Sequence, residues 1–174
     1  MSKYIKKFLF LFILTFYSSY SYSDMPHYVD FNYILNESNA GKKAQNFLKS
    51  SLDKGIKDLK NVENKLQEEE KKIIKQKKIL KPEEYKSKVD DLRSKVSNLQ
   101  KNRNDLLQNI SKKRSKARNE LLKNLNPIIE EYMKEKTIRM VIDKKSLLLA
   151  DEKLNITKEI LDRLNKKLKS INLE

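Results

Sequence analysis

The chain has 174 residues, of which 36% are charged, 38% hydrophobic and 8% aromatic, with 39 basic residues against 24 acidic ones. With no cysteine and one histidine, it cannot form disulfides, thiolate metal sites or a Cys–His nucleophilic pair. Two glycines are too few for a phosphate-binding loop or for the tight turns of a many-stranded β-sandwich, so the composition favours long charged helices.

Residues 1–23 have the layout of a secretory signal peptide. Lysines at positions 3, 6 and 7 precede an apolar run over 8–17, and the small residues Ser21 and Ser23 fit a cleavage site before Asp24. An uncleaved membrane anchor is the alternative, but a run of ten is well short of the roughly 20 apolar residues that span a bilayer. We therefore expect export and removal of residues 1–23.

The remaining chain is strongly basic. Residues 1–23 hold three of the 39 basic residues and no acidic one, so residues 24–174 carry a net charge of +12. A lysine-rich composition also arises in AT-biased genomes without selection for binding. In either case, a field of this size attracts acidic proteins and anionic lipid head groups over about a Debye length.

Residues 24–37 open the exported chain with a short apolar segment, HYVDFNYIL over 27–35. Tyr28, Val29 and Phe31 favour a strand, which Asp30 and Asn32 could turn into a brief helix. His27 has no second histidine nearby, so we expect a surface position and no metal or catalytic role.

Residues 38–132 have the pattern of a long helical hairpin. Ser38 can cap a first helix, in which apolar residues recur at intervals of seven. Pro82, followed by two glutamates, ends that helix and begins a second, so the tip is expected near 78–84. The first seam comprises Leu52, Leu59, Leu66, Ile73 and Leu80; the second helix carries Tyr85, Leu92, Leu99 and Leu106 beside Val89, Val96, Ile110 and Ala117, with Arg103 interrupting.

Two helices alone are too thin to bury a globular core, so the hairpin is expected to be flexible. Gly55 and Pro127 are the hinge candidates, because glycine loosens a helix interior and proline kinks it. For Gly41 we favour a role in close packing.

Residues 133–174 return to short elements: a strand over 138–143, a turn, a second strand over 147–150 and an amphipathic helix over 157–169. So few strands are marginal alone, so we expect them to form one body with residues 24–37 and to be completed by oligomerisation. The expected body and oligomerisation core consists of Val29, Phe31, Ile34, Leu35, Ile138, Met140, Val141, Ile142, Leu147, Leu149, Ile160 and Leu164.

The hairpin tip concentrates positive charge. Between positions 71 and 88 there are eight lysines against Glu83 and Glu84, a local charge of +6. We expect this tip to contact an anionic partner, although a merely solvated helix end would have the same composition. The lysines are Lys71, Lys72, Lys75, Lys77, Lys78, Lys81, Lys86 and Lys88.

Three parts of the chain form a recognisable set: SNAGKKAQ at 38–45, the lysine-rich hairpin, and IRMVIDKKSLLLAD with NITKEI between 138 and 160. Through these segments the chain resembles the Skp/OmpH family of periplasmic chaperones. The hairpin alone would match any coiled coil, so the flanking segments are the specific part. Asn155 departs from the family, which usually has aspartate before Ile-Thr.

The resemblance implies a mainly α protein, with the long antiparallel hairpin as a tentacle on a small β-barrel body completed in a jellyfish-like homotrimer. It also implies an ATP-independent periplasmic holdase without cofactor, which keeps unfolded outer-membrane proteins in a cavity between the arms.

The sequence also leaves alternative functions open. A coiled-coil scaffold of the cell envelope is the main alternative, followed by a protein that binds lipopolysaccharide or anionic phospholipid through the tip lysines. Nucleic acid is not expected as a partner, because the arm has few stacking aromatics and few arginines. No enzyme is expected, since scattered carboxylates on a solvated helix make no water-excluding site.

Overall fold

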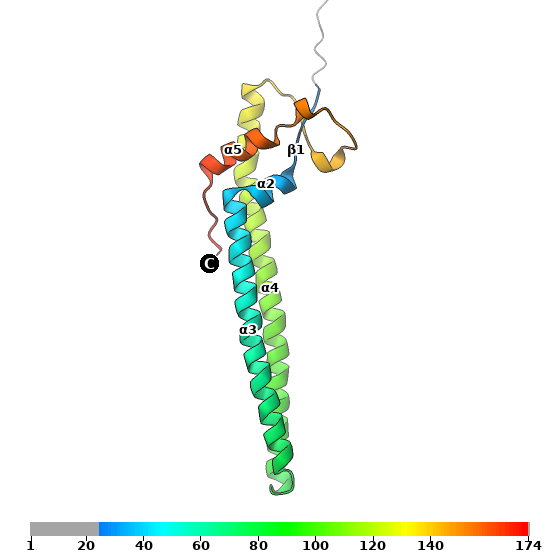
Figure 1. Ribbon diagram of the computed structural model, residues 1–174, viewed down its shortest axis with the longest axis vertical. Helices are drawn as coiled ribbons and strands as arrows, with labels where there is room; N and C mark the ends of the chain where they lie inside the picture. Colours follow the sequence, from blue (N-terminus) through cyan, green and yellow to red (C-terminus); the bar gives the residue numbers. More distant parts are fainter. Residues whose placement is uncertain (1–24, 174) are drawn as a thin grey trace, which may run out of the picture.

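The computed structural model describes residues 25–173, so the predicted signal peptide lies outside the described residues. Two long helices, α3 (Asn39–Gln76) and α4 (Pro82–Glu135), run antiparallel as an arm that extends from a small body (Figure 1). At 1.5 Å per residue, α3 is about 57 Å long. The expectation of a mainly helical chain with a small β component is confirmed.

The body is assembled from both ends of the described chain. It contains β1 (His27–Val29), α2 (Phe31–Glu37), β2 (Val141–Asp143) and α5 (Thr157–Lys167), together with the body end of α4 (Figure 1). Two single-turn 3-10 helices, Lys144–Ser146 and Glu152–Leu154, lie between β2 and α5. In residues 25–173, no helix is long and apolar enough to cross a bilayer.

The arm follows the heptad pattern. The Ser38 side chain caps α3 by accepting a hydrogen bond from the Gly41 backbone N at 3.1 Å. Pro82 begins α4, with Glu83 and Glu84 in its first turn as expected. The apolar seam is enclosed to different degrees: Leu66, Ile73, Leu99, Ile110 and Ala117 are buried, its other apolar members are partly buried, and Val96 is 51% exposed.

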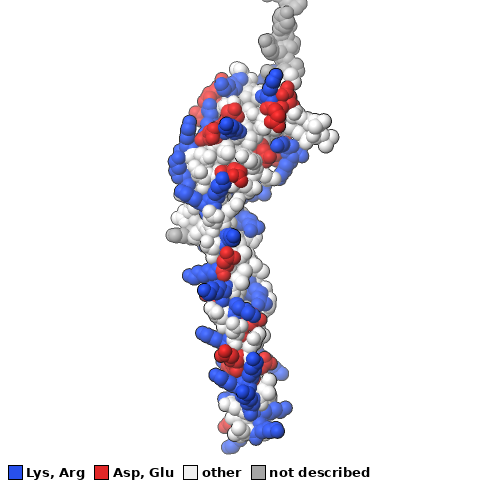
Figure 2. Space-filling view, viewed as in Figure 1, with Lys and Arg blue, Asp and Glu red and all other residues white. Residues whose placement is uncertain are grey.

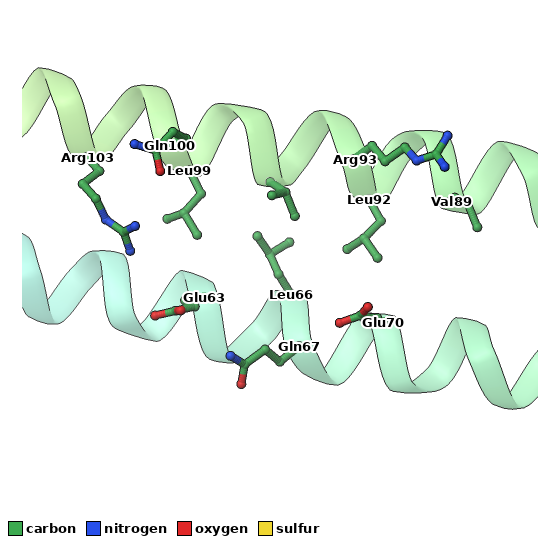
Figure 3. Close-up of a pocket in the computed structure, with 11 residues that line it drawn as sticks. Glu63, Leu66, Gln67, Glu70, Val89, Leu92, Arg93, Leu99, Gln100 and Arg103 are labelled. Atoms are coloured by element: carbon green, nitrogen blue, oxygen red, sulfur yellow. The ribbon is translucent and has the colours of Figure 1, made fainter.

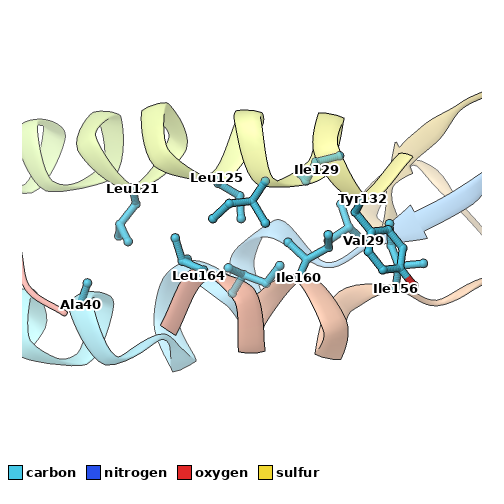
Figure 4. Close-up of a cluster of buried hydrophobic side chains, with 11 residues drawn as sticks. Val29, Ala40, Leu121, Leu125, Ile129, Tyr132, Ile156, Ile160 and Leu164 are labelled. Carbon is cyan, nitrogen blue, oxygen red and sulfur yellow. The ribbon is translucent and has the colours of Figure 1, made fainter. Parts of the chain in front are cut away.

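The core of the body lies where α4 meets α2 and α5 (Figure 4). Residues 121–132, which the sequence analysis placed in the arm, supply almost half of its buried side chains. From residue 121 onward, α4 therefore packs into the core of the body. The part of the hairpin that extends free of the body is shorter than the predicted range of 38–132. The buried cluster is Val29, Ile34, Ala40, Leu121, Leu125, Ile128, Ile129, Tyr132, Ile156, Ile160 and Leu164.

A small network of hydrogen bonds joins the residue after β1 to the start of α5. The Asp30 backbone N donates to Thr157 Oγ1 at 2.9 Å, and that hydroxyl donates to Asn155 Oδ1 at 2.6 Å. Asn155 Oδ1 also accepts from the Thr157 backbone N at 3.1 Å. Asn155, where the family usually has aspartate, thus still supplies the side-chain oxygen that holds the start of α5.

The β component is smaller than expected. β1 pairs in parallel with β2, aligning Tyr28 with Ile142, and Tyr28 also forms a bridge with Asn155. Of the strand expected over 138–143 only Val141–Asp143 forms, and the strand expected over 147–150 does not form in the described chain. β1 is flanked by β2 and by the bridge to Asn155, and within the described chain residues 147–150 pair neither with β1 nor with the other edge of β2.

Candidate binding surfaces of the arm and body

The tip of the arm is a basic turn. Residues 77–81 connect α3 to α4, and all eight lysines that the sequence analysis assigned to the tip are exposed. Within residues 25–173 none of the eight has a carboxylate oxygen within 4.0 Å, although Lys88 Nζ donates to Gln76 Oε1 at 3.2 Å. Figure 2 shows basic side chains along the arm and at its free end.

One large aliphatic side chain sits among these lysines. Ile79, at the centre of the turn, is 84% exposed. Beside it, Lys77 Nζ lies 5.9 Å from the ring centroid of Tyr85. The tip therefore offers unpaired ammonium groups around an apolar point, a combination suited to an anionic partner that also has apolar groups.

A hollow opens between the helices nearer the tip. This distal groove has a volume of about 560 Å³, and Leu66, Leu92 and Leu99 form its apolar floor (Figure 3). Arg93 and Arg103 lie at its rim. Its remaining lining residues are Glu63, Gln67, Glu70, Val89, Val96 and Gln100.

A second hollow, the proximal groove, lies where the arm leaves the body and has a volume of about 840 Å³. Leu48, Leu52 and Ile110 provide apolar surface, and Lys49, Arg114 and Arg118 are its charged lining residues. No acidic side chain lines it. The other lining residues are Asn32, Leu35, Asn36, Gly41, Ala44, Gln45, Asn46, Ala117 and Leu121.

Neither groove was predicted from the sequence, in which Arg103 was interpreted as an interruption of the seam. The available signal was the interval of seven that links Arg93, Gln100, Leu107 and Arg114, because such an interval keeps residues on one side of a coiled coil.

The predicted body residues fall into two groups in a single chain. Val29, Ile34, Ile160 and Leu164 are buried in the core, and Phe31, Leu35, Ile138 and Val141 pack against it. Ile142 and Leu147 are half-buried.

The second group faces solvent. Leu149 is 95% exposed, its neighbour Leu148 is fully exposed, and Met140 is more than half exposed. The single chain therefore leaves apolar side chains exposed on both sides of β2: Met140 directly before it, and Leu148 and Leu149 on the loop after it.

The two hinge candidates lie within unbroken helices. α3 continues through Gly55, where an added Cβ would lie 2.5 Å from Leu106 Cδ1 across the hairpin. A close helix contact therefore accounts for this glycine, as it does for Gly41, where an added Cβ would lie 1.9 Å from the Leu35 carbonyl oxygen. Pro127 lies inside α4. Bending at either position stays a prediction.

Shifted titratable groups are explained by burial and ion pairing. Burial raises the pKa of Tyr28, with a further contribution from Glu152, and burial also raises the pKa of Tyr132. Hydrogen bonding to Asp91 and Glu69 raises the pKa of Lys95.

In residues 25–173, no group of three or more His, Asp or Glu side chains is placed to hold a metal ion. The Nδ1 atom of His27 is buried without a hydrogen-bond partner.

Comparisons with known proteins agree with this architecture. Residues 27–164 match the family model described as outer membrane protein (OmpH-like). A solved structure of a candidate OmpH-like outer membrane chaperone from Caulobacter crescentus superimposes with a TM-score of 0.79 at 17% identity, covering 85% of this chain and 89% of that chain. No curated protein sequence matches this chain.

Proposed function

Since the chain belongs to the OmpH-like family of outer membrane proteins, we propose that it is a periplasmic chaperone that holds unfolded outer-membrane proteins and prevents their aggregation. The observation that carries this proposal is the arm itself. It is long, basic and hollowed along its length, and it extends from the body without packing a globular core of its own. Such a surface suits many weak contacts with an unfolded chain.

The working unit in this proposal is a homotrimer. A body with a two-stranded sheet is small, and it leaves Met140, Leu148 and Leu149 exposed. Burial of these apolar side chains between copies would complete the body and bring three arms around one cavity. Residues 147–150, which form no strand in the described single chain, would then pair with a strand of a neighbouring subunit.

Client capture follows from charge and from weak contacts. Residues 24–174 carry +12, so a trimer carries about +36, which attracts an acidic unfolded protein over about a Debye length. Many contacts of low individual energy then hold the client. Release needs no nucleotide, because each contact is readily exchanged.

The tip lysines give this proposal its anionic contact region. They would meet either an acidic client or the phosphates of lipopolysaccharide and phospholipid head groups. Export by a cleaved signal peptide over residues 1–23 completes the proposal, and it accounts for a chaperone that works without ATP.

Dilution of a urea-unfolded outer-membrane β-barrel protein, with and without the mature chain, tests the chaperone function directly. Light scattering should fall in proportion to added chain and reach a minimum near one trimer per client. An envelope scaffold would leave the scattering unchanged. That result would reject the chaperone proposal.

A further inference from the structure

Both grooves open on the same side of the arm. Ile56 lies seven residues from Lys49, which lines the proximal groove, and seven from Glu63, which lines the distal groove. On α4, Leu107 lies seven residues from Gln100, which lines the distal groove, and seven from Arg114, which lines the proximal groove. Because intervals of seven preserve position around a coiled coil, the two grooves and the surface between them form one continuous strip.

This strip, the groove face, also carries exposed aliphatic side chains. Ile56 and Leu107 lie between the grooves, Val96 lines the distal groove, and Ile74 lies seven residues from the lining residue Gln67. The four are between 51% and 59% exposed. Apolar contacts are thus available along the arm and not only at its base.

The opposite edge of the seam is closed by polar contacts. Lys95 Nζ lies 2.7 Å from Glu69 Oε1, and Lys88 donates to Gln76. Nearer the body, Lys113 Nζ lies 5.1 Å from the ring centroid of Phe47. These contacts join α3 to α4 on the side of the seam away from the groove face.

Arginine is confined to the groove face within the hairpin. The chain has six arginines among 39 basic residues, and four of them lie in α4 as lining residues of the two grooves. Among the described residues, Arg103, Arg114 and Arg118 have no carboxylate oxygen within 4.0 Å, while Arg93 pairs only with the exposed Asp90. A guanidinium binds a carboxylate through two parallel N–H groups and stacks on aromatic rings, which an ammonium does not do.

We propose that the groove face is the surface on which this chain holds an extended segment of unfolded client, in which apolar side chains alternate with polar ones that include aspartate or glutamate. The inference rests on the proposed function and assigns it to one side of the arm. Volumes of about 560 and 840 Å³ accommodate apolar side chains. The unpaired guanidinium groups supply the partners for the client's carboxylates.

Matched variants can distinguish binding by the groove face from attraction by the overall positive charge of the arm. The test variant is Arg103→Gln/Arg114→Gln/Arg118→Gln. The control, Lys101→Gln/Lys112→Gln/Lys116→Gln, removes the same charge from exposed positions on the other side of α4. For the apolar part, Ile56→Gln/Leu107→Gln is compared with Val62→Gln, an exposed position that lines neither groove and lies seven residues from Glu69. Circular dichroism checks that each variant remains helical.

The probe is a fluorescein-labelled synthetic peptide of alternating leucine or tyrosine and serine or aspartate, with an asparagine analogue for comparison. By anisotropy, the arginine variant should bind the aspartate peptide about tenfold more weakly and lose its preference over the asparagine peptide. The lysine control should change affinity less than about twofold. Equal losses in both triple variants, or no loss in the arginine variant, would overturn the assignment of a face.

The proposed function is tested separately in the same set. If the wild-type chain suppresses aggregation of the urea-unfolded β-barrel protein but the groove variants do so equally well, the chaperone function stands and the groove face is wrong. If the wild-type chain gives no suppression, the chaperone function fails whatever the peptides show.

Discussion

Arg163 of α5 forms a two-point ion pair with Glu135, the last residue of α4. Its Nη1 donates to Glu135 Oε1 at 2.8 Å, its Nη2 donates to Oε2, and its guanidinium carbon lies 4.9 Å from the ring centroid of Tyr132. Hydrogen bonding to Arg163 lowers the pKa of Glu135. This contact fixes α5 across the end of the long helix, beside the body core.

The Glu135–Arg163 pair should make the stability of the body depend on pH. A carboxyl whose pKa is lower in the folded state stabilises the fold above its unfolded pKa, about 4.3, and loses that contribution as pH falls through the folded value. Glu135→Gln should therefore unfold at lower urea than wild type at pH 7, and the difference should shrink below about pH 4. The exposed Glu130→Gln variant is the control, and a Glu135→Gln difference that is constant from pH 7 to pH 3 would contradict the assignment.

Thr137 is held in an unfavourable conformation immediately after α4. Its φ is 54°, and Ile138 N donates to Met133 O at 2.9 Å, which is the Schellman ending in which glycine usually occupies this position. Thr137→Gly should raise the free energy of unfolding by about 1 kcal/mol at fixed protein concentration, because relief of backbone strain outweighs the added freedom of the unfolded chain. Thr137→Ala, which keeps a Cβ, should give little gain. Destabilisation by glycine would show that the threonine is not strained.

The two glycines should respond differently to the same added methyl group. In Gly41→Ala the new Cβ meets a backbone oxygen 1.9 Å away, so α2 must move, and we expect a loss of about 3 kcal/mol. In Gly55→Ala it meets the flexible end of Leu106, and the gain in helix propensity of about 1 kcal/mol offsets much of the clash. Urea unfolding of the two variants tests this order. Equal losses would mean that the α3–α4 contact at Gly55 is as rigid as the α2–α3 corner.

The heptad pattern predicted the arm well because both partners of its seam were visible in the sequence. Leu66 and Leu99 are buried where intervals of seven place them, and Pro82 begins α4. The end of α4 was harder. Leu125 and Tyr132 continue an apolar pattern, but nothing local in the sequence says that their partner is α5 and not α3.

The short strands could not be predicted from propensity alone. Residues 147–150 are apolar enough for a strand, yet a strand forms only where it pairs with another, and in the described chain these residues pair with neither β1 nor β2. The groove face was missed for a related reason. In the sequence, a charged residue at a seam position, such as Arg103, indicates only a weak point of the coiled coil. The structure shows that Arg103 lines a groove between α3 and α4.

The exposed leucines after β2 should decide the oligomeric state. If copies of the body bury Leu148 and Leu149 against one another, Leu148→Ser/Leu149→Ser should dissociate the assembly at concentrations where wild type is trimeric. Light scattering coupled to size exclusion measures this mass. Ile79→Ser, which changes another highly exposed aliphatic side chain at the far tip of the arm, should leave the mass unchanged. A monomeric wild type would reject the trimer.

The tip lysines should set the salt dependence of client binding. Replacing all eight with glutamine removes exposed charges that have no carboxylate partner among residues 25–173, so helix stability should change little while long-range attraction falls. We expect weaker binding of an acidic, urea-unfolded β-barrel protein at low salt and a shallower fall in affinity between about 50 and 300 mM NaCl, measured by anisotropy.

A matched control for the tip exists on the body, where eight lysines can be changed to glutamine without touching Lys144, which lies 3.8 Å from Asp30. These control positions are Lys134, Lys136, Lys145, Lys153, Lys158, Lys166, Lys167 and Lys169. Because both variants lose the same net charge, a field set by total charge predicts equal effects, whereas capture at the tip predicts the larger loss of affinity in the tip variant. If the tip variant keeps wild-type affinity and salt dependence, the tip is a solvated helix end and the contact lies elsewhere on the arm.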